Sequence, residues 1–319
     1  MIVDIIVPMN SIDFGVFIGP EDNTYETLKT RAVLGDELGY HSLWVSDHLL
    51  GMYDSPASPW LECWTTVAAL GAATRNLMLG QLTMAATFRN PALLAKMAAT
   101  LDVVTGGRAI LSVGAGWHEG EFHSYGYDYG SKRSRAGRLD EAAEIIKLMW
   151  TEETPSFEGR QYRIREAHCS PKPVQKPHIP LMVAGNGERL TLRTVARHGD
   201  MSNFAEWVGT PETFRHKAEV LERHCLRVDR DPEEIRKTWA AFVFIDEDRG
   251  RAEEKSKSFF SGSGWTPPTR GLVGDPETVT QRISEYVDEG ATLFILSFLG
   301  DDWEREARLF MGEVAPEFR

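Results

Sequence analysis

An aspartate and a histidine, Asp47 and His48, stand together directly after the apolar run at residues 42–46. This run is typical of a short buried strand, so the pair is expected where that strand ends. A histidine at such a place can hydrogen-bond a bound ring or move a proton near neutral pH. In the structural alternative, Asp47 caps the next loop and His48 has no chemical role. Both interpretations stay open on these residues alone.

Glycines follow a second strand-like run. Gly114, Ala115 and Gly116 come at its end, and Trp117 comes next. Two glycines let a backbone approach a ligand closely, although they equally suit a tight turn. The dinucleotide-binding fingerprint needs a third glycine three residues beyond Gly116, and that position holds a glutamate. Trp117 can stack on a planar ring or simply cover the end of the fold.

A third group, Gly185, Asn186 and Gly187, precedes a helical pattern at residues 188–197. Free N–H groups at a helix N-terminus bind anions, so we predict a phosphate site here. Read alone, Leu82 and Thr83 are core residues.

The basic residues at 132–135, with Arg138, form either a solvated face or a contact for an anionic cofactor tail. No metal site is predicted. His118 and His123 are five residues apart, whereas a helical zinc pair is spaced by four. The three cysteines form no CxxC pair and no disulfide framework.

The elements that must position these residues alternate along the whole chain. Strand-like runs stand at residues 12–18, 42–46, 76–84, 109–114, 180–185, 201–204, 237–245 and 291–298, with helical patterns between them. Eight such units favour one (β/α)8 TIM barrel over residues 1–319, with an open doubly wound sheet as the alternative. The proline-rich segment at about 151–179 predicts an inserted hairpin or lid, and residues 261–269 a mobile loop. Active residues of such barrels follow the strands.

The charge and hydropathy patterns exclude several classes of partner. The formal net charge is −12 and the isoelectric point about 5.3, which disfavours nucleic acid and anionic lipid. No stretch is apolar enough to span a membrane, and residues 1–17 do not resemble a signal peptide. We therefore expect a cytoplasmic protein that acts on a small molecule.

Taken together, the motifs resemble the luciferase-like family of flavin and deazaflavin oxidoreductases, and most closely its subgroup that uses coenzyme F420. The resemblance covers most of residues 12–300. It is carried by Leu38-Gly39-Tyr40-His41-Ser42-Leu43-Trp44-Val45-Ser46-Asp47-His48, Thr87-Phe88-Arg89-Asn90-Pro91, Gly106-Gly107-Arg108, Gly114-Ala115-Gly116-Trp117, Pro171-Lys172-Pro173-Val174-Gln175 and Gly185-Asn186-Gly187-Glu188-Arg189.

This resemblance implies a bacterial-luciferase-like barrel that transfers a hydride between F420 and a small organic substrate. Asp47 and His48 would lie beside the cofactor ring, with His48 as proton donor or acceptor. The remaining residues fall into two groups. For the cofactor ring, the resemblance implies Leu82 and Thr83, joined by a non-prolyl cis peptide behind the ring, and Gly114, Ala115 and Gly116 near it. For the cofactor phosphate, it implies Gly185, Asn186 and Gly187. The substrate would be enclosed by Phe17, Trp44, Trp117 and Tyr125.

One departure from the family pattern concerns the acid group. In the sugar-phosphate dehydrogenases of the family, an acidic proton donor follows the second glycine, where this chain has Trp117. Glu119 or Glu121 would have to replace that donor, and sugar phosphate is not the favoured substrate.

Three other functions and one oligomeric state are also considered. The main alternative is an FMN-dependent monooxygenase that uses reduced flavin and oxygen on the same barrel. A metal-dependent hydrolase is disfavoured because the first strand lacks His-x-His, and a non-catalytic binding barrel is the third. The resemblance also implies a homodimer, for which the Ala-rich helix at residues 61–74 is a candidate contact.

Overall fold

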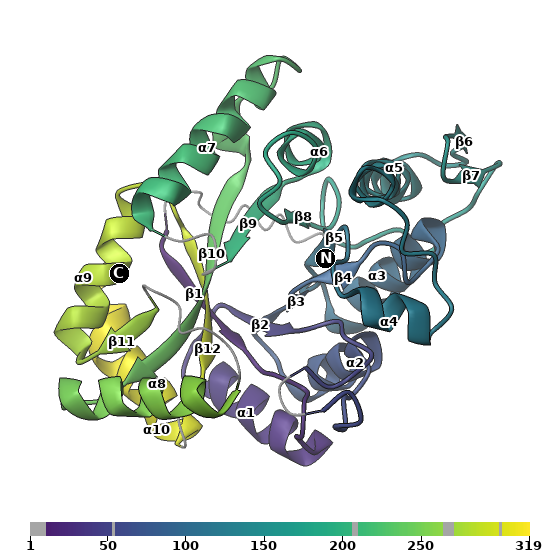
Figure 1. The fold of residues 1–319 in the computed structure, drawn as a ribbon. Helices are drawn as coiled ribbons and strands as arrows, with labels where there is room; N and C mark the ends of the chain where they lie inside the picture. The colour runs from purple at the N-terminus through teal and green to yellow at the C-terminus, as the bar shows by residue number, and fades with distance from the viewer. Residues whose placement is uncertain (1–10, 53–54, 206–209, 264–270, 300–301) are drawn as a thin grey trace.

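The computed structural model describes residues 11–52, 55–205, 210–263, 271–299 and 302–319. Its centre is a parallel sheet surrounded by helices (Figure 1). The principal strands are β1 (Asp13–Phe17), β2 (Ser42–Val45), β3 (Met78–Gln81), β5 (Leu111–Gly114), β8 (Leu181–Ala184), β9 (Met201–Ala205), β10 (Arg236–Ile245) and β12 (Leu293–Phe298).

The sheet closes on itself. Its strands follow the order β3-β2-β1-β12-β10-β9-β8-β5, all paired in parallel. β3 then meets the start of β5, because the Leu79 N–H donates to Arg108 O at 2.7 Å and the Ile110 N–H donates to Leu79 O at 2.9 Å. The predicted (β/α)8 TIM barrel is therefore confirmed, and the open sheet is excluded.

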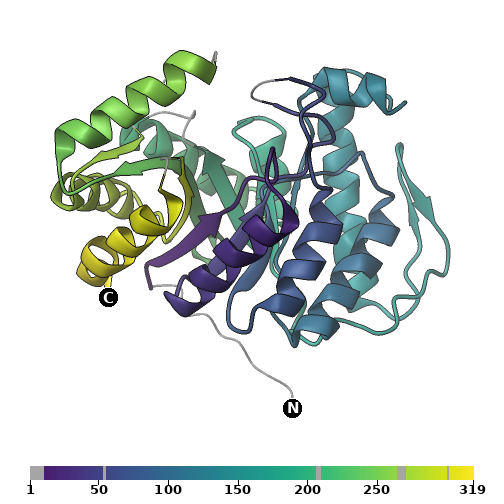
Figure 2. The same ribbon diagram turned by 90° about the horizontal axis from the view of Figure 1, so that it is seen from below.

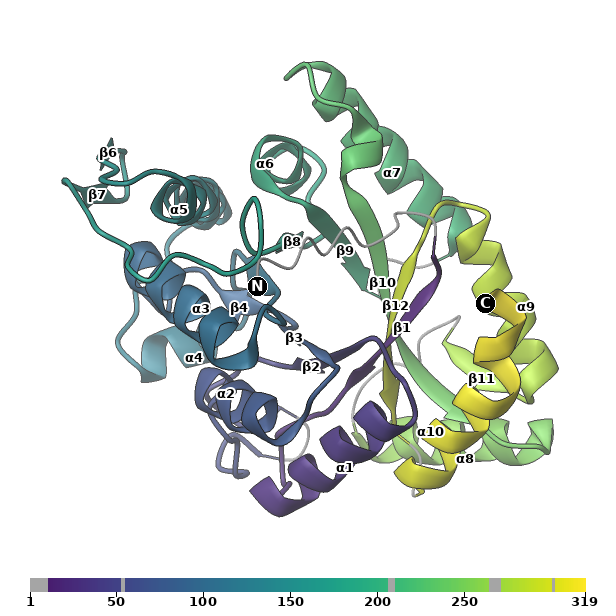
Figure 3. The ribbon, with the colours of Figure 1, turned by 180° about the vertical axis from the view of Figure 1, so that it is seen from behind.

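Helices cover the outside of the barrel, as the views from below (Figure 2) and from behind (Figure 3) show. They are α1 (Tyr25–Glu37), α2 (Cys63–Ala73), α3 (Pro91–Thr105), α4 (Glu119–Ser124), α5 (Lys132–Thr151), α6 (Thr191–His198), α7 (Pro211–Leu226), α8 (Arg249–Ser263), α9 (Pro276–Val287) and α10 (Trp303–Leu309). Among the described residues, no helix is long and apolar enough to cross a membrane.

Local sequence sets the ends of these helices. At the start of α1, the Thr24 side chain accepts a hydrogen bond from the Thr27 N–H, which satisfies a free donor of the first turn. α3 begins with Asn90 as N-cap and Pro91 in its first turn. It ends at Gly106, whose φ of 69° is the left-handed conformation that glycine adopts most readily.

The structure also departs from the expected elements. The predicted strand at 76–84 is two strands, β3 and the short β4 (Met84–Ala85), separated by Leu82 and Thr83. α6 begins at Thr191 instead of residue 188, because residues 188–190 form a turn. The helices α4 and α10 were not predicted, and neither was β11 (Leu272–Gly274), which pairs with β10.

The proline-rich insertion holds two short antiparallel strands, β6 (Phe157–Glu158) and β7 (Arg163–Ile164). Glu141 of α5 anchors their turn, since its carboxylate accepts the N–H groups of Arg160, Gln161 and Tyr162 at 2.8–3.0 Å. In Figure 1 this hairpin lies on the outer side of α5, away from the strands.

The segment expected to be mobile is split. Residues 261–263 are the last residues of α8, and residues 264–269 lie outside the described residues.

Candidate active site at the carboxyl end of the barrel

The predicted site residues gather at the carboxyl ends of neighbouring strands. Asp47 and His48 follow β2, Leu82 and Thr83 follow β3, and Ala115 follows β5. Because all these strands are parallel, their ends meet at one mouth of the barrel. The structure thus brings together residues that lie far apart in the sequence.

Asp47 is held in a buried ion pair. Its carboxylate accepts hydrogen bonds from both terminal nitrogens of Arg89, at 2.9 and 3.0 Å, and from the Ala85 N–H, at 3.0 Å. Burial raises the pKa of Asp47, and the Arg89 guanidinium opposes that rise. Arg89 also reaches Glu62, at 2.5 Å, which caps the N-terminus of α2. Asp47 therefore ties the end of β2 to β4, to the loop before α3 and to α2.

His48 is paired with a second buried carboxylate. Its Nδ1 lies 3.1 and 3.0 Å from the two carboxylate oxygens of Glu121, on α4. Glu121 is only 2% exposed and also accepts the N–H groups of Leu49, at 2.6 Å, and Leu50, at 3.3 Å. Burial by itself would raise the pKa of Glu121, but the hydrogen bonds from His48 and these two amides outweigh it and lower the pKa.

The Glu121 contact selects one tautomer of His48. An ionised carboxylate only accepts hydrogen bonds, so the Nδ1 that faces Glu121 carries the proton. Nε2 is then the basic nitrogen, and no described residue hydrogen-bonds to it. The His48–Glu121 pair can accept a proton at Nε2, with the carboxylate stabilising the imidazolium that forms.

Aromatic rings surround His48. Its ring lies edge-on to those of Trp60, at 5.2 Å between centroids, and Trp117, at 5.8 Å. His118 lies 6.5 Å away, and its Nδ1 accepts the Glu121 N–H at the start of α4. Trp117 is 59% exposed, so it offers a large apolar surface at the mouth. Tyr125 is also exposed, and its hydroxyl donates to Leu49 O.

The segment after β3 has the backbone that the resemblance implies, because the Leu82–Thr83 peptide bond is cis. The Thr83 hydroxyl lies 3.1 Å from that of Ser112 on β5, so a hydrogen bond joins the segment between β3 and β4 to β5. Gly114 lies beside this segment, and a Cβ at Gly114 would come within 3.0 Å of the Thr83 methyl group. The close approach accounts for the glycine at position 114.

Gly116 needs to be glycine for two reasons. Its φ is 74°, and a Cβ there would stand 2.7 Å from the ring of Phe122. Its carbonyl accepts the Nε–H of Arg135 at 3.2 Å. Gly116 and Arg135 thus fix the turn that carries Ala115 and Trp117 over the end of β5.

The predicted anion loop lies between β8 and α6. Gly185, Asn186 and Gly187 are all exposed, and Gly185 has a φ of 127°. The Gly185 N–H donates to Asn203 O at 3.4 Å, whereas the N–H groups of Asn186 and Gly187 have no acceptor among the described residues. Two free amides ahead of a helix N-terminus fit an anion.

Two of the expected substrate-wall residues differ in their surroundings. Phe17, at the end of β1, is partly exposed. Trp44 is completely buried, so its assignment to the substrate wall is corrected. Its ring lies between Gly15 and Gly80, where a Cβ on either glycine would approach it within 2.6 Å. Its Nε1 donates to the Ser42 hydroxyl at 2.8 Å, and Trp44 therefore fills the barrel interior.

The basic residues at the start of α5 differ in whether they are engaged by other groups of the protein. Arg135 is buried and donates to carbonyl groups, and Arg138 pairs with Asp128. Lys132 and Arg133 are exposed and stay available to an anionic tail. Glu119, one candidate replacement for the missing acid, is also exposed and lies 3.9 Å from His123.

Sequence reasoning missed two features of this site. Glu121 was considered as an acid but not as the partner of His48, which is 73 residues away. Trp60 was not singled out at all. Its indole N–H and the Ser46 hydroxyl are both buried without a hydrogen-bond partner among the described residues. A tryptophan in the loop after β2 was the only available signal.

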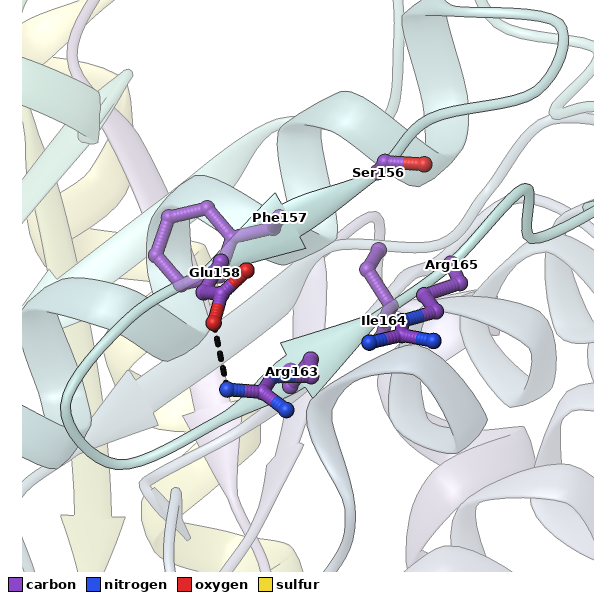
Figure 4. A pocket seen from close by; sticks show the side chains of 6 residues that line it. All are labelled: Ser156, Phe157, Glu158, Arg163, Ile164 and Arg165. Carbon is purple, nitrogen blue, oxygen red and sulfur yellow. Dashed lines mark hydrogen bonds and ion pairs between the residues drawn. The ribbon is translucent and has the colours of Figure 1, made fainter.

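A separate hollow of about 300 Å³ lies on the β6–β7 hairpin (Figure 4). It is lined by residues 156–158 and 163–165 and crossed by the Glu158–Arg163 ion pair. None of the residues at the barrel mouth lines it, so it plays no part in the candidate site.

Comparison with known proteins supports this arrangement. The F420-dependent glucose-6-phosphate dehydrogenase of Amycolatopsis mediterranei (strain U-32) is 28% identical over 328 residues, which cover 94% of this chain and 95% of the relative. The structure of an F420-dependent secondary alcohol dehydrogenase superposes with a TM-score of 0.86 at 19% identity, over 97% of this chain and 99% of that chain. The monooxygenase RslO1 from Streptomyces bottropensis gives a TM-score of 0.83 at 20% identity, over 97% and 100%. At these identities the two structures show the fold alone.

A family model described as luciferase-like monooxygenase matches residues 11–271. The match includes the strand ends that carry His48, the cis peptide, Gly116 and the anion loop. On this match over most of its length, the chain belongs to the luciferase-like monooxygenase family.

Proposed function

We propose that this protein is an F420-dependent oxidoreductase that transfers a hydride between the deazaflavin and a small organic substrate. The observation that carries the proposal is the His48–Glu121 pair, which provides a basic nitrogen at the end of β2, at the same barrel mouth as the Leu82–Thr83 cis peptide. The name of the Amycolatopsis mediterranei relative, an F420-dependent dehydrogenase, supports the choice of cofactor.

The residues present fit such a cofactor. Asn186 and Gly187 offer a phosphate two amides that have no acceptor within the described part of the chain, and Gly185 allows the backbone to turn toward it. Ala115 and Gly116 would line the ring edge, and Leu82 and Thr83 would support the ring from behind. Lys132 and Arg133 are the candidate contacts for an anionic tail. When bound, F420 supplies the hydride acceptor or donor.

The chain's own residues then handle the proton and the orientation. During oxidation of a hydroxyl, His48 Nε2 accepts the hydroxyl proton, and Glu121 holds the ring so that this nitrogen faces the substrate. Phe17, Trp117 and Tyr125 form the substrate wall and exclude water, together with Trp60. Asp47 acts as a positioning residue, because its carboxylate is fully used by Arg89 and Ala85.

Substitution of His48 tests this role. The His48→Ala variant is expected to lose at least about a hundredfold in kcat, the usual range for a general base, while its Kd for F420 changes by less than threefold. Glu119→Ala, an exposed carboxylate nearby, is the control. An unchanged kcat in His48→Ala would remove His48 from the reaction.

A second candidate is an FMN-dependent monooxygenase that uses reduced flavin and oxygen. It is favoured by the family's description and by the likeness to a monooxygenase of known structure. In that case a flavin with the mass of FMN would stay with the purified protein. Oxygen consumption in the presence of reduced FMN would then replace F420 reduction as the measured activity.

We also propose that the chain forms a homodimer through the outer face of α2 and α3. α2 contains no charged residue, and α3 exposes Leu93 and Val104, at 55% and 65%. Leu93→Glu should convert a dimer into a monomer in sedimentation, whereas Leu226→Glu, at a more exposed position on α7, should not. A wild-type monomer would contradict this assembly.

The cytoplasm is the proposed compartment. Cys63, Cys169 and Cys225 are all free and buried, as suits a reducing environment.

A further inference from the structure

The charged residues in the loop segments near His48 are all acidic. Three segments follow β1, β2 and β5 at residues 18–24, 46–62 and 115–131, and together they contain eight Asp or Glu and no Lys or Arg. These are the segments that supply His48, Trp60 and Trp117. The part of the mouth where a substrate meets His48 therefore has no cation of its own.

The described cations of the neighbouring elements are engaged elsewhere or assigned to the cofactor. Lys132 and Arg133, which follow directly at the start of α5, are exposed and are the candidate contacts for the anionic tail of the cofactor. Arg89 is fully engaged by Asp47 and Glu62. Arg135 donates to three backbone carbonyls, including those of Gly116 and Gly130. Arg189 is exposed, but it belongs to the anion loop between β8 and α6.

The aromatic groups in contact with the His48 ring include two indoles, which carry no charge. Trp60 and Trp117 place ring surfaces within 6 Å of the His48 ring. The segment after β2 holds two buried hydrogen-bonding atoms without a partner among the described residues, the Trp60 indole N–H and the Ser46 hydroxyl. Such a site can pair with a neutral oxygen, whereas an anion would lie among carboxylates without a counter-charge.

We infer that the substrate is an uncharged, largely apolar molecule whose reacting oxygen meets His48, and that sugar phosphates and other anions are excluded. The inference rests on the proposed function and names its substrate class. For a secondary alcohol, the carbinol C–H bond breaks and its electron pair leaves with the hydrogen as a hydride to the deazaflavin. The O–H proton passes to His48 Nε2, and a ketone remains. The curated relative described above is named for glucose-6-phosphate, so this chain would differ from it in substrate.

A matched pair of ligands tests the inference. 4-Methylcyclohexanol and 4-hydroxycyclohexanecarboxylate carry the same secondary alcohol and differ by one negative charge. We expect the neutral ligand to have at least a tenfold lower Kd, measured by tryptophan fluorescence with and without F420, and a correspondingly higher kcat/KM for F420 reduction. Glucose 6-phosphate should behave like the carboxylate.

Added charge supplies the control. Trp117→Arg should reduce the preference for the neutral ligand by at least fivefold, and Trp117→Met should leave its sign unchanged. Equal affinities, tighter binding of the anion, or no detectable binding of either ligand would overturn the inference. Failure of the proposed function looks different, because F420 would then neither bind nor be reduced, while the fluorescence titration without F420 still measures the charge preference.

Discussion

At the scale of single residues, the barrel mouth holds two buried carboxylates to which we assign different tasks. Asp47 is neutralised by a guanidinium, whereas Glu121 faces an imidazole and two backbone amides. A carboxylate beside a histidine sets its tautomer and favours its protonated form. Glu121 is therefore a positioning residue for His48, and Asp47 a positioning residue for the strand end.

Glu121→Gln tests the first task. The amide preserves the shape but removes the charge, so we expect kcat to fall by about tenfold to a hundredfold, as for other residues that orient a reactive histidine. The Kd for F420 should change by less than threefold, because Glu121 acts through His48 and not on the cofactor. Glu119→Gln should change neither quantity. A lower kcat accompanied by a similar loss of F420 affinity would mean that Glu121 is only structural.

Arg89→Leu tests the second task. Removal of the guanidinium leaves Asp47 buried without a counter-charge, which costs about 3–5 kcal/mol of unfolding free energy. Arg138→Leu breaks the pair with the exposed Asp128 carboxylate and should cost no more than about 1 kcal/mol. Urea denaturation of both variants measures the difference, and equal losses would contradict the assigned role of the buried pair.

At the scale of elements, the sequence predicted strands well where an apolar run has clear ends. The run at 42–46 became β2, and the run at 109–114 became β5 with a later start. The prediction of one strand at 76–84 was wrong. Nothing in the residue types of this run, read alone, indicates the break at Leu82 and Thr83. α4 is only six residues long, too short for a helical period to show.

The turn after β5 carries an element-scale prediction. Gly116→Ala forces a side chain into a left-handed backbone and against Phe122, so it should lower the free energy of unfolding by about 1–3 kcal/mol. Gly137→Ala is the matched control, since it lies within α5 with open space around it. That change should stabilise by up to about 1 kcal/mol. Equal thermal denaturation of the two variants would contradict the account of the turn.

At the scale of the whole molecule, the barrel could be predicted because alternation of strands and helices repeats along the chain. The partners within the site could not, because they join distant strands. The pairing of His48 with Glu121 and of Asp47 with Arg89 depends on how β2, β4 and α4 meet in three dimensions. The resemblance supplied the positions of the site residues but gave no reason for their hydrogen bonds.

Stability should depend on pH through buried histidines. Burial, together with Arg236, lowers the pKa of His41 from 6.5 to about 4 despite the nearby Asp13. Between those pH values the unfolded chain binds more protons, so the free energy of unfolding falls as pH is lowered from 6.5 toward 4. The loss is at most about 1.4 kcal/mol per pH unit for one such group.

Denaturation at several pH values measures this slope. His41→Gln should flatten it, and His168→Gln, at an exposed position, should leave it unchanged. An identical slope in wild type and His41→Gln would show that His41 does not titrate as described.

The central claim is that the barrel mouth binds a deazaflavin and uses it for hydride transfer. The most direct measurement is a paired fluorescence titration of the purified protein with F420 and with FMN. We expect micromolar binding of F420 and much weaker binding of FMN. Gly187→Pro, which removes one loop amide, should weaken F420 binding. Tighter binding of FMN than of F420 would contradict the claim and assign the protein to oxygen-using flavin chemistry.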